Sequence, residues 1–223
     1  MAPSKTGRTN TVTKTILFDL DGTLTDSGEG IMNCAVEALR YFGLPIPDEK
    51  ILRTIVGPPL DDSLIRLGVA PQDVDKGIEV FRKRYTSVGK YENHPYPGIA
   101  DLLQKLQSDG HTLYVATSKP ECMALDIMDH FDLSRYFTKI CGATLDRSRA
   151  SKSAVIAYLL EHCENPQNMV MVGDTAFDVL GAKEHGIPTV GVSWGYGEIS
   201  DMEQAGACAV AHTMEELYEL LSR

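Results

Sequence analysis

From residue 94 onward, the sequence alternates short apolar runs with segments of helical periodicity. This alternation restricts the possible folds more than any other feature, because each kind of segment fits only one kind of element. Strands that alternate with helices in this way form a parallel sheet that is covered on both faces. The sequence therefore predicts an α/β fold with a parallel sheet. The predicted strands are TLYVAT, KICGA, MVMVG, PTVGV and a brief CAVA.

One more apolar run, TILFDL at residues 15–20, comes before this alternation and ends at an Asp-Gly turn signal. Residues 48–91 keep a helical pattern without a convincing strand. Asp26 and Glu29 resemble a capping box that would begin the first of these helices. The predicted organisation is a disordered tail over 1–13, an α/β core made of 14–26 and 94–223, and an all-helical cap over 27–93.

Charge and composition exclude several classes of function. The formal net charge of −10 disfavours a nucleic acid polymer or an anionic membrane as partner. No apolar run is long enough to span a membrane, and the polar N-terminus does not resemble a secretory signal. The five cysteines are scattered and never spaced as CxxC, as expected of reduced thiols in the core. We expect a cytoplasmic protein, either a monomer or a small homo-oligomer.

Polar side chains stand at the ends of three of the predicted strands. Asp19 and Asp21 end the first run, Thr117 ends TLYVAT, and Asp174 follows MVMVG. In open α/β sheets, ligands bind outside the carboxyl ends of the strands, so these side chains should converge. One aspartate at a strand end is usually a turn or a helix cap, but three such strand ends together indicate a site. Because the net charge is negative, an anionic substrate needs local cations or a metal.

These residues resemble the motifs of the haloacid dehalogenase-like superfamily of phosphohydrolases. The resemblance covers the chain from residue 14, including the cap, and it implies a Rossmann-like core with an inserted helical domain. The matching motifs are DxDGT at Asp19-Leu20-Asp21-Gly22-Thr23, a strand-ending Thr117, a lysine at Lys152 and GDxxxD at Gly173-Asp174-Thr175-Ala176-Phe177-Asp178.

The resemblance implies a phosphatase whose nucleophile is Asp19, which would form an aspartyl-phosphate. A carboxylate is repelled by phosphate, so a hard dication such as Mg²⁺ is needed to neutralise the pair. The implied ligands are Asp19, the backbone carbonyl of Asp21 and the carboxylate of Asp174. Asp21 would also protonate the leaving oxygen and later activate water.

The resemblance also implies a set of groups that hold the transferred phosphoryl oxygens. These are the Thr117 hydroxyl, the Ser118 backbone N–H and the Lys152 ammonium. Asp178 is expected to support the site through bound water or through Lys152. Lys119 is a further candidate for the same oxygens, unless it is solvated or paired with an acidic neighbour.

The residue at position 21 separates branches of the superfamily. Dehalogenases lack the second aspartate, so Asp21 favours phosphate esters. Phosphosugar mutases of the β-phosphoglucomutase type share Asp21, but their cap carries an arginine in a GxxREDS pattern, where this chain has Leu60. A small phosphorylated metabolite is therefore the expected substrate. A mutase and a catalytically silent phosphate-binding module remain the alternatives.

Three further segments resemble the subgroup of phosphoglycolate phosphatases and bacterial 5′-nucleotidases. They are the GPPL loop, the run from Asp146 to Arg149, and WGYG. Gly57, Pro58 and Pro59 either face the substrate and influence specificity or only break a helix. Arg147 and Arg149 either meet a distal anionic group of the substrate or are solvated at the surface.

Overall fold

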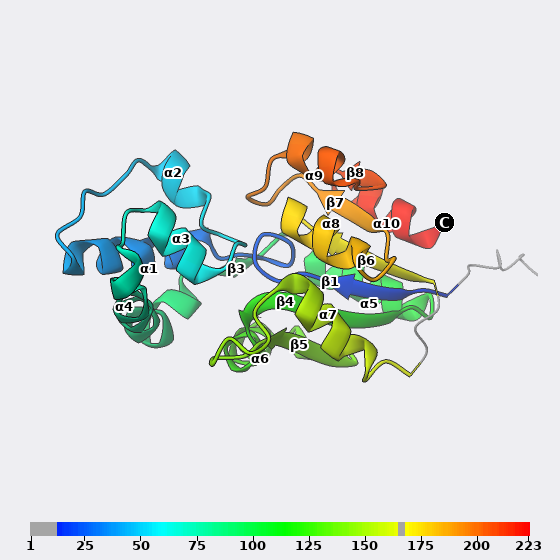
Figure 1. Cartoon of the computed structure of the whole chain (residues 1–223). Helices are drawn as coiled ribbons and strands as arrows, with labels where there is room; N and C mark the ends of the chain where they lie inside the picture. Colours follow the sequence, from blue (N-terminus) through cyan, green and yellow to red (C-terminus); the bar gives the residue numbers. More distant parts are fainter. Residues whose placement is uncertain (1–12, 165–167) are drawn as a thin grey trace, which may run out of the picture.

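The structure, a computed structural model, describes residues 13–164 and 168–223, and it has a sheet core with a helical cap beside it (Figure 1). The predicted tail lies outside the described residues, apart from Thr13. All paired neighbours in the main sheet are parallel, which confirms the predicted α/β class. The strands follow the order β5 (Lys139–Ala143), β4 (Thr112–Pro120), β1 (Thr15–Phe18), β6 (Met169–Gly173), β7 (Thr189–Val192) and β8 (Ala209–Ala211).

Strand β1 is the centre of the sheet and lies between β4 and β6. Its side chains alternate between the two faces: Ile16 and Phe18 pack into one hydrophobic cluster and Leu17 into another. All three are fully buried, and each stabilises the fold by roughly 1.5–3 kcal/mol. A continuous apolar run is therefore required here, since both faces of the strand are covered.

Helices cover both faces of the sheet. The cluster around Ile16 receives side chains from three helices, and the cluster around Leu17 receives them from two others. A further helix packs beside the second group. The first three are α5 (Ile99–Ser108), α6 (Glu121–His130) and α10 (Met214–Ser222), the next two are α7 (Lys152–Leu160) and α8 (Ala176–Lys183), and the last is α9 (Ile199–Ala205).

The cap contains α-helices and short 3₁₀ turns over residues 28–91, as the periodicity predicts. Ala38 and Leu39 of the first helix pack against Leu64 and Ile78. The predicted capping box is wrong: Asp26 lies in a short strand and accepts a hydrogen bond from Tyr196 Oη. The α-helices of the cap are α1 (Gly28–Tyr41), α2 (Glu49–Arg53), α3 (Leu60–Arg66) and α4 (Val74–Ser87).

A short antiparallel ribbon joins the cap to the core. It pairs β2 (Thr25–Asp26) with β3 (His94–Pro95), so the chain leaves and re-enters the core side by side. These two-residue strands are too short to be recognised from sequence periodicity. They lie where the sequence predicts the border between core and cap.

All five cysteines lie in the described part of the chain, and none of them is in a disulfide. Cys34 and Cys141 are buried as predicted, but Cys122 and Cys208 are exposed, so the core placement is wrong for these two. Neither exposed residue belongs to one of the four hydrophobic clusters. Within the described ranges, the helices are all too short or too polar to cross a membrane.

Candidate active site

The carboxyl ends of β1 and β6 bring three aspartates together. Asp19 directly follows β1 and Asp174 directly follows β6, and these two strands are parallel neighbours. Asp178 lies in the first turn of α8, close behind Asp174. One carboxylate oxygen from each of the three lies within 4.8 Å of the others, and all three residues are buried. The predicted convergence of strand ends is therefore present in the structure.

The turn after β1 places the loop against Asp174. Gly22 has a φ of +84°, and a Cβ on it would lie 2.2 Å from Asp174 Oδ2, so only glycine fits. Thr23 Oγ1 donates a hydrogen bond to Asp174 Oδ1 at 3.0 Å, and the Tyr196 backbone N–H donates to Oδ2 at 2.9 Å. Both oxygens of Asp174 are thus held in fixed directions.

Lys152 lies in the middle of the acidic cluster, at the first residue of α7. Its Nζ is 2.7 Å from Asp19 Oδ1 and 2.8 Å from Asp178 Oδ1, and it donates to the Ala116 carbonyl at 2.8 Å. Burial alone would lower the pKa of Lys152, but the Asp178 and Asp19 carboxylates raise it above its ordinary value. The ammonium therefore stays charged, and the lysine singled out in the sequence lies against the candidate nucleophile.

The cluster of Asp19, Asp174 and Asp178 carries more negative charge than the ammonium of Lys152 can neutralise. Burial raises the pKa of Asp19 to about 6, with Lys152 acting against the rise and Asp178 adding to it. Burial also raises the pKa of Asp174 well above its usual range, and the Asp178 and Asp19 charges add to the effect. Three buried carboxylates with one nearby lysine are a hard oxygen donor set with excess negative charge. This donor set fits a divalent cation such as Mg²⁺.

Both predicted ligand carboxylates are in this cluster, together with a third that the sequence did not assign as a ligand. The sequence assigns ligand carboxylates to Asp19 and Asp174 and a backbone carbonyl to Asp21, whereas the structure adds the carboxylate of Asp178 to the first two. Asp178 also caps α8, since its Oδ2 accepts hydrogen bonds from Thr175 N at 3.0 Å and Thr175 Oγ1 at 2.8 Å. Its other oxygen meets Lys152, so the predicted link through that lysine is present.

The side chain of Asp21 points to a different cation. Lys119 Nζ lies 2.5 Å from Asp21 Oδ1 and 2.7 Å from Oδ2, and both side chains are almost fully buried. Of the alternatives for Lys119, pairing with an acidic neighbour is the one observed. Burial acts to lower the pKa of Lys119, yet the Asp21 charge keeps it above its ordinary value. Lys119 lies in β4, and its backbone N–H donates to Thr117 Oγ1 of the same strand at 3.2 Å.

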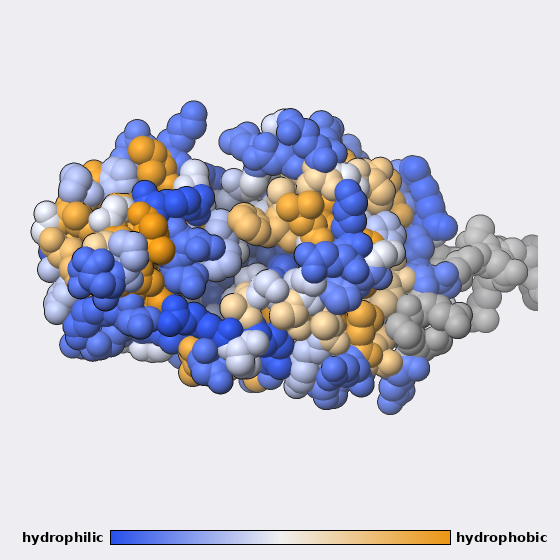
Figure 2. All heavy atoms as spheres, in the orientation of Figure 1, coloured by the Kyte–Doolittle hydropathy of each residue, from blue (hydrophilic) through white to orange (hydrophobic). Residues whose placement is uncertain are grey.

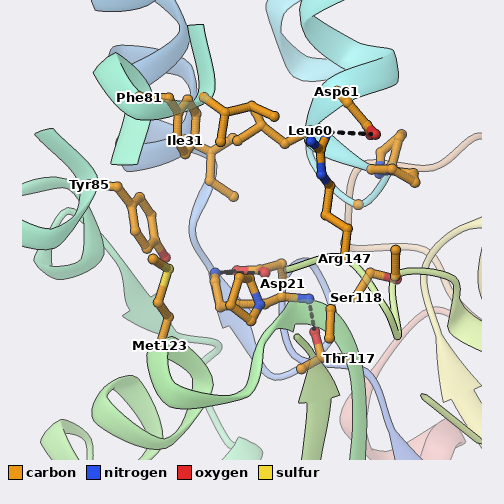
Figure 3. Close-up of a pocket in the computed structure, with 18 of the residues that line it drawn as sticks. Asp21, Ile31, Leu60, Asp61, Phe81, Tyr85, Thr117, Ser118, Met123 and Arg147 are labelled. Atoms are coloured by element: carbon orange, nitrogen blue, oxygen red, sulfur yellow. Dashed lines mark hydrogen bonds and ion pairs between the residues drawn. The ribbon is translucent and has the colours of Figure 1, made fainter. Parts of the chain in front are cut away.

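A cavity lies between the core and the cap, and Figure 2 shows the surface hollowed where the two meet. Its volume, including the part open to solvent, is about 940 Å³. In the close-up, Ile31, Phe81 and Tyr85 of the cap face Asp21 and Thr117 of the core (Figure 3). The floor is polar and the cap wall is largely apolar. The floor consists of Asp19, Asp21, Thr117, Ser118 and Lys119.

The GPPL segment runs from the connection after α2 into the first residue of α3, and it lines this cavity. Gly57 has a φ of +103°, and a Cβ on it would lie 3.1 Å from Thr175 Cγ2, so the cap loop approaches the core beside Asp174. Gly57, Pro58 and Pro59 therefore both separate two helices and face the cavity. Leu60, at the position of the mutase arginine, lines the cavity as well.

The two arginines before α7 have different surroundings. Arg147 reaches across to the cap, where its Nη1 lies 3.5 Å from Asp61 and its Nη2 lies 2.6 Å from Asp75. Arg149 stays in the core and pairs with Glu121 at 3.0 Å. Arg147 also lines the cavity (Figure 3), so neither arginine is simply solvated.

Sequence reasoning missed the cap residues of the cavity, Ile31, Phe81 and Tyr85. Each follows helical periodicity, and that pattern alone cannot distinguish a core position from a cavity wall. It also missed Tyr196, whose backbone holds Asp174, although the WGYG segment containing it was singled out. No local signal shows that this loop contacts the end of β6.

Comparisons with known proteins agree with this geometry. A family model described as haloacid dehalogenase-like hydrolase matches residues 16–192. Tyrosine-protein kinase PtkA of Mycobacterium tuberculosis is 41% identical over 209 residues, covering 92% of this chain and 72% of that protein. A 5′-nucleotidase of Pseudomonas aeruginosa is 40% identical over 195 residues, covering 84% of this chain and 86% of that protein.

A solved structure of a predicted phosphatase from Clostridium acetobutylicum has a TM-score of 0.90 and 35% identity. It covers 94% of this chain, which in turn covers 98% of that one. Further relatives are named phosphoglycolate phosphatase. The predicted resemblance to the superfamily and to its phosphoglycolate phosphatase and 5′-nucleotidase subgroup is thereby confirmed.

Proposed function

Because the chain belongs to the haloacid dehalogenase-like hydrolases and is a phosphatase of this family, we propose that it hydrolyses a small phosphate monoester through an aspartyl-phosphate on Asp19, with the help of Mg²⁺. The observation that carries the proposal is the buried contact of Asp19 with Lys152 beside Asp174 and Asp178. A nucleophilic carboxylate, a fixed cation and further oxygen donors thus lie together, and Asp19 of this group lines the cavity between core and cap.

In the proposed reaction, Asp21 takes up a proton before the attack. Asp19 then attacks phosphorus, the P–O bond to the leaving group breaks, and the leaving oxygen takes the proton from Asp21. The Thr117 hydroxyl, the Ser118 backbone N–H and the Lys152 ammonium stabilise the charge on the transferred oxygens. Asp21 then takes a proton from the water that hydrolyses the aspartyl-phosphate. Asp19, Asp174 and the backbone carbonyl of Asp21, with Asp178 beside them, would hold Mg²⁺, which when bound would supply positive charge that offsets the repulsion of carboxylate and phosphate.

The cavity supports a phosphoglycolate-like or 5′-nucleotide-like substrate. Ile31, Phe81 and Tyr85 form an apolar wall that suits the organic part of a leaving group. Arg82 and Arg147 line the same cavity, and Arg147 is paired there with Asp61 and Asp75 of the cap. The GPPL loop lines the cavity where the cap meets the core, so we assign Gly57, Pro58 and Pro59 a role in specificity. Relatives named 5′-nucleotidase and phosphoglycolate phosphatase support the same substrate range.

A second candidate function is transfer of the phosphoryl group to a hydroxyl other than that of water. The observation in its favour is the 41% identity to a protein named tyrosine-protein kinase. A phosphosugar mutase is a special case of such transfer, but Leu60 offers no charge for a second phosphate where mutases have arginine. A silent binding module is disfavoured, because such a module has no need for both the Asp19 cluster and the Asp21–Lys119 pair.

The test is release of inorganic phosphate from p-nitrophenyl phosphate and from a panel that includes phosphoglycolate and 5′-nucleotides. We expect turnover that disappears with EDTA, returns with Mg²⁺ and is abolished by Asp19→Asn. Asp126→Asn is the matched control, since Asp126 is exposed and pairs with Lys90 on the surface. Retained activity in Asp19→Asn would exclude the nucleophile assignment. Substrate consumption without phosphate release, with a phosphorylated acceptor instead, would favour the second candidate.

A further inference from the structure

The carboxylate of Asp21 has to be held in one direction to serve a leaving-group oxygen. Its backbone is fixed by the turn, where Asp21 bridges to Thr25 and the Gly22 N–H donates to the Thr25 carbonyl at 2.8 Å. These contacts leave the side-chain torsions free. Both carboxylate oxygens are instead engaged by one group, Lys119 Nζ, at 2.5 and 2.7 Å. The orientation of Asp21 therefore depends on Lys119.

Lys119 is in turn fixed by its surroundings. Its backbone N–H is bonded to Thr117 Oγ1 at 3.2 Å, and its side chain is only 5% exposed. Its Nζ lies 5.1 Å from the centroid of the Tyr85 ring, a favourable arrangement of a cation over an aromatic face. Tyr85 is a buried residue of α4, and it faces Asp21 from the cap side of the cavity (Figure 3). The cap thus contacts the lysine that holds Asp21.

We propose that Lys119 is a positioning residue for Asp21, and that Tyr85 fixes Lys119 while the cap covers the site. This inference rests on the proposed acid/base role of Asp21. It differs from the role expected from the sequence, in which Lys119 is a candidate for the phosphoryl oxygens. Two of the three N–H groups of the ammonium are directed to the Asp21 carboxylate instead.

The two roles of Lys119 predict different kinetics. A proton donor matters most when the leaving group is a poor one, so misplacing Asp21 should impair an alkyl phosphate more than p-nitrophenyl phosphate. For Lys119→Met we expect kcat/KM, which reports only the step in which the leaving group departs, to fall about 100-fold with the best alkyl phosphate of the panel and less than about 10-fold with p-nitrophenyl phosphate. We expect kcat to fall with both substrates as well, because Asp21 also activates the water that hydrolyses the aspartyl-phosphate common to both.

A double-mutant cycle separates action through Asp21 from an independent effect. In an Asp21→Asn background, Lys119→Met should have no further effect on kcat. Lys90→Met is the matched control. Lys90 Nζ lies 2.8 Å from Asp126 Oδ2 and 5.0 Å from the Tyr91 ring centroid, so this lysine also contacts an aspartate and a tyrosine ring, but outside the cavity. That control should keep wild-type kcat with both substrates. Lys119→Gln serves as the second variant if Lys119→Met does not fold.

Three results would overturn the inference. They are an equal loss of kcat/KM with both leaving groups, a raised KM with unchanged kcat, which indicates a phosphate ligand, and a Lys119→Met effect that persists in full in the Asp21→Asn background. Failure of the proposed function gives a different result. In that case the wild-type protein releases no phosphate, or Asp21→Asn has wild-type kcat with the alkyl phosphate.

Discussion

Replacing Lys152 by methionine should destabilise the protein strongly in the absence of a metal. The Nζ of Lys152 is the cation that lies between Asp19 and Asp178, at 2.7 and 2.8 Å. Methionine fills a similar volume but leaves two buried carboxylates without this counter-charge. Breaking a buried ion pair in this way costs about 3–5 kcal/mol. For a domain of this size, each kcal/mol lowers Tm by about 2–4 °C, so the expected fall in Tm is about 6–20 °C.

Thermal unfolding in EDTA, followed by circular dichroism, measures this change. Lys76→Met is the matched control, because Lys76 also pairs with a carboxylate, Glu79 at 2.8 Å, but at an exposed position. Its Tm should equal that of the wild type, since exposed ion pairs contribute little. An unchanged Tm in Lys152→Met would refute the reasoning, because it would mean that Lys152 does not compensate the buried carboxylates.

Three further predictions concern the metal, the turn and the cap. Mg²⁺ at about 100 times its Kd should stabilise the wild type by about 2.7 kcal/mol, measured as a rise in Tm, and Asp174→Asn should abolish the rise. Gly22→Ala should lower the free energy of unfolding, measured with urea, by about 1–3 kcal/mol and remove most of the activity, because the new Cβ would lie 2.2 Å from Asp174 Oδ2. Wild-type activity in this variant would contradict the prediction. Arg147→Ala should change the free energy of unfolding by less than about 1 kcal/mol, because Arg147 is half exposed. It should nevertheless speed proteolysis at the border of the cap, because Arg147 joins the core to Asp61 and Asp75 of the cap. An unchanged rate of proteolysis would count against this link.

The core could be predicted from the sequence because its strands are covered on both faces. Runs such as TILF and MVMVG have to be apolar throughout, and few other folds use such runs between helical segments. The convergence of Asp19 and Asp174 followed from the same topology, since parallel neighbours end at the same edge. The helical nature of the cap was also predictable, because Ala38, Leu39 and their partners recur at helical spacing.

The rest of the site depends on contacts between distant segments. Asp178 was predicted to support the site, but its place beside Asp19 depends on how α8 packs behind β6. Tyr85 lies 34 residues before Lys119 in the sequence, and only the closure of the cap on the core brings its ring within 5.1 Å of Nζ. The β2–β3 ribbon has two residues in each strand, too few for any periodicity.

The central claim is that Asp19 carries the phosphoryl group during the reaction. The most direct measurement is acid quenching of a single turnover, followed by peptide mass spectrometry of the protein. We expect the mass of one added phosphoryl group on the peptide that contains Asp19, and none in Asp19→Asn. Phosphate release without any labelled peptide, or a label on a different residue, would contradict it.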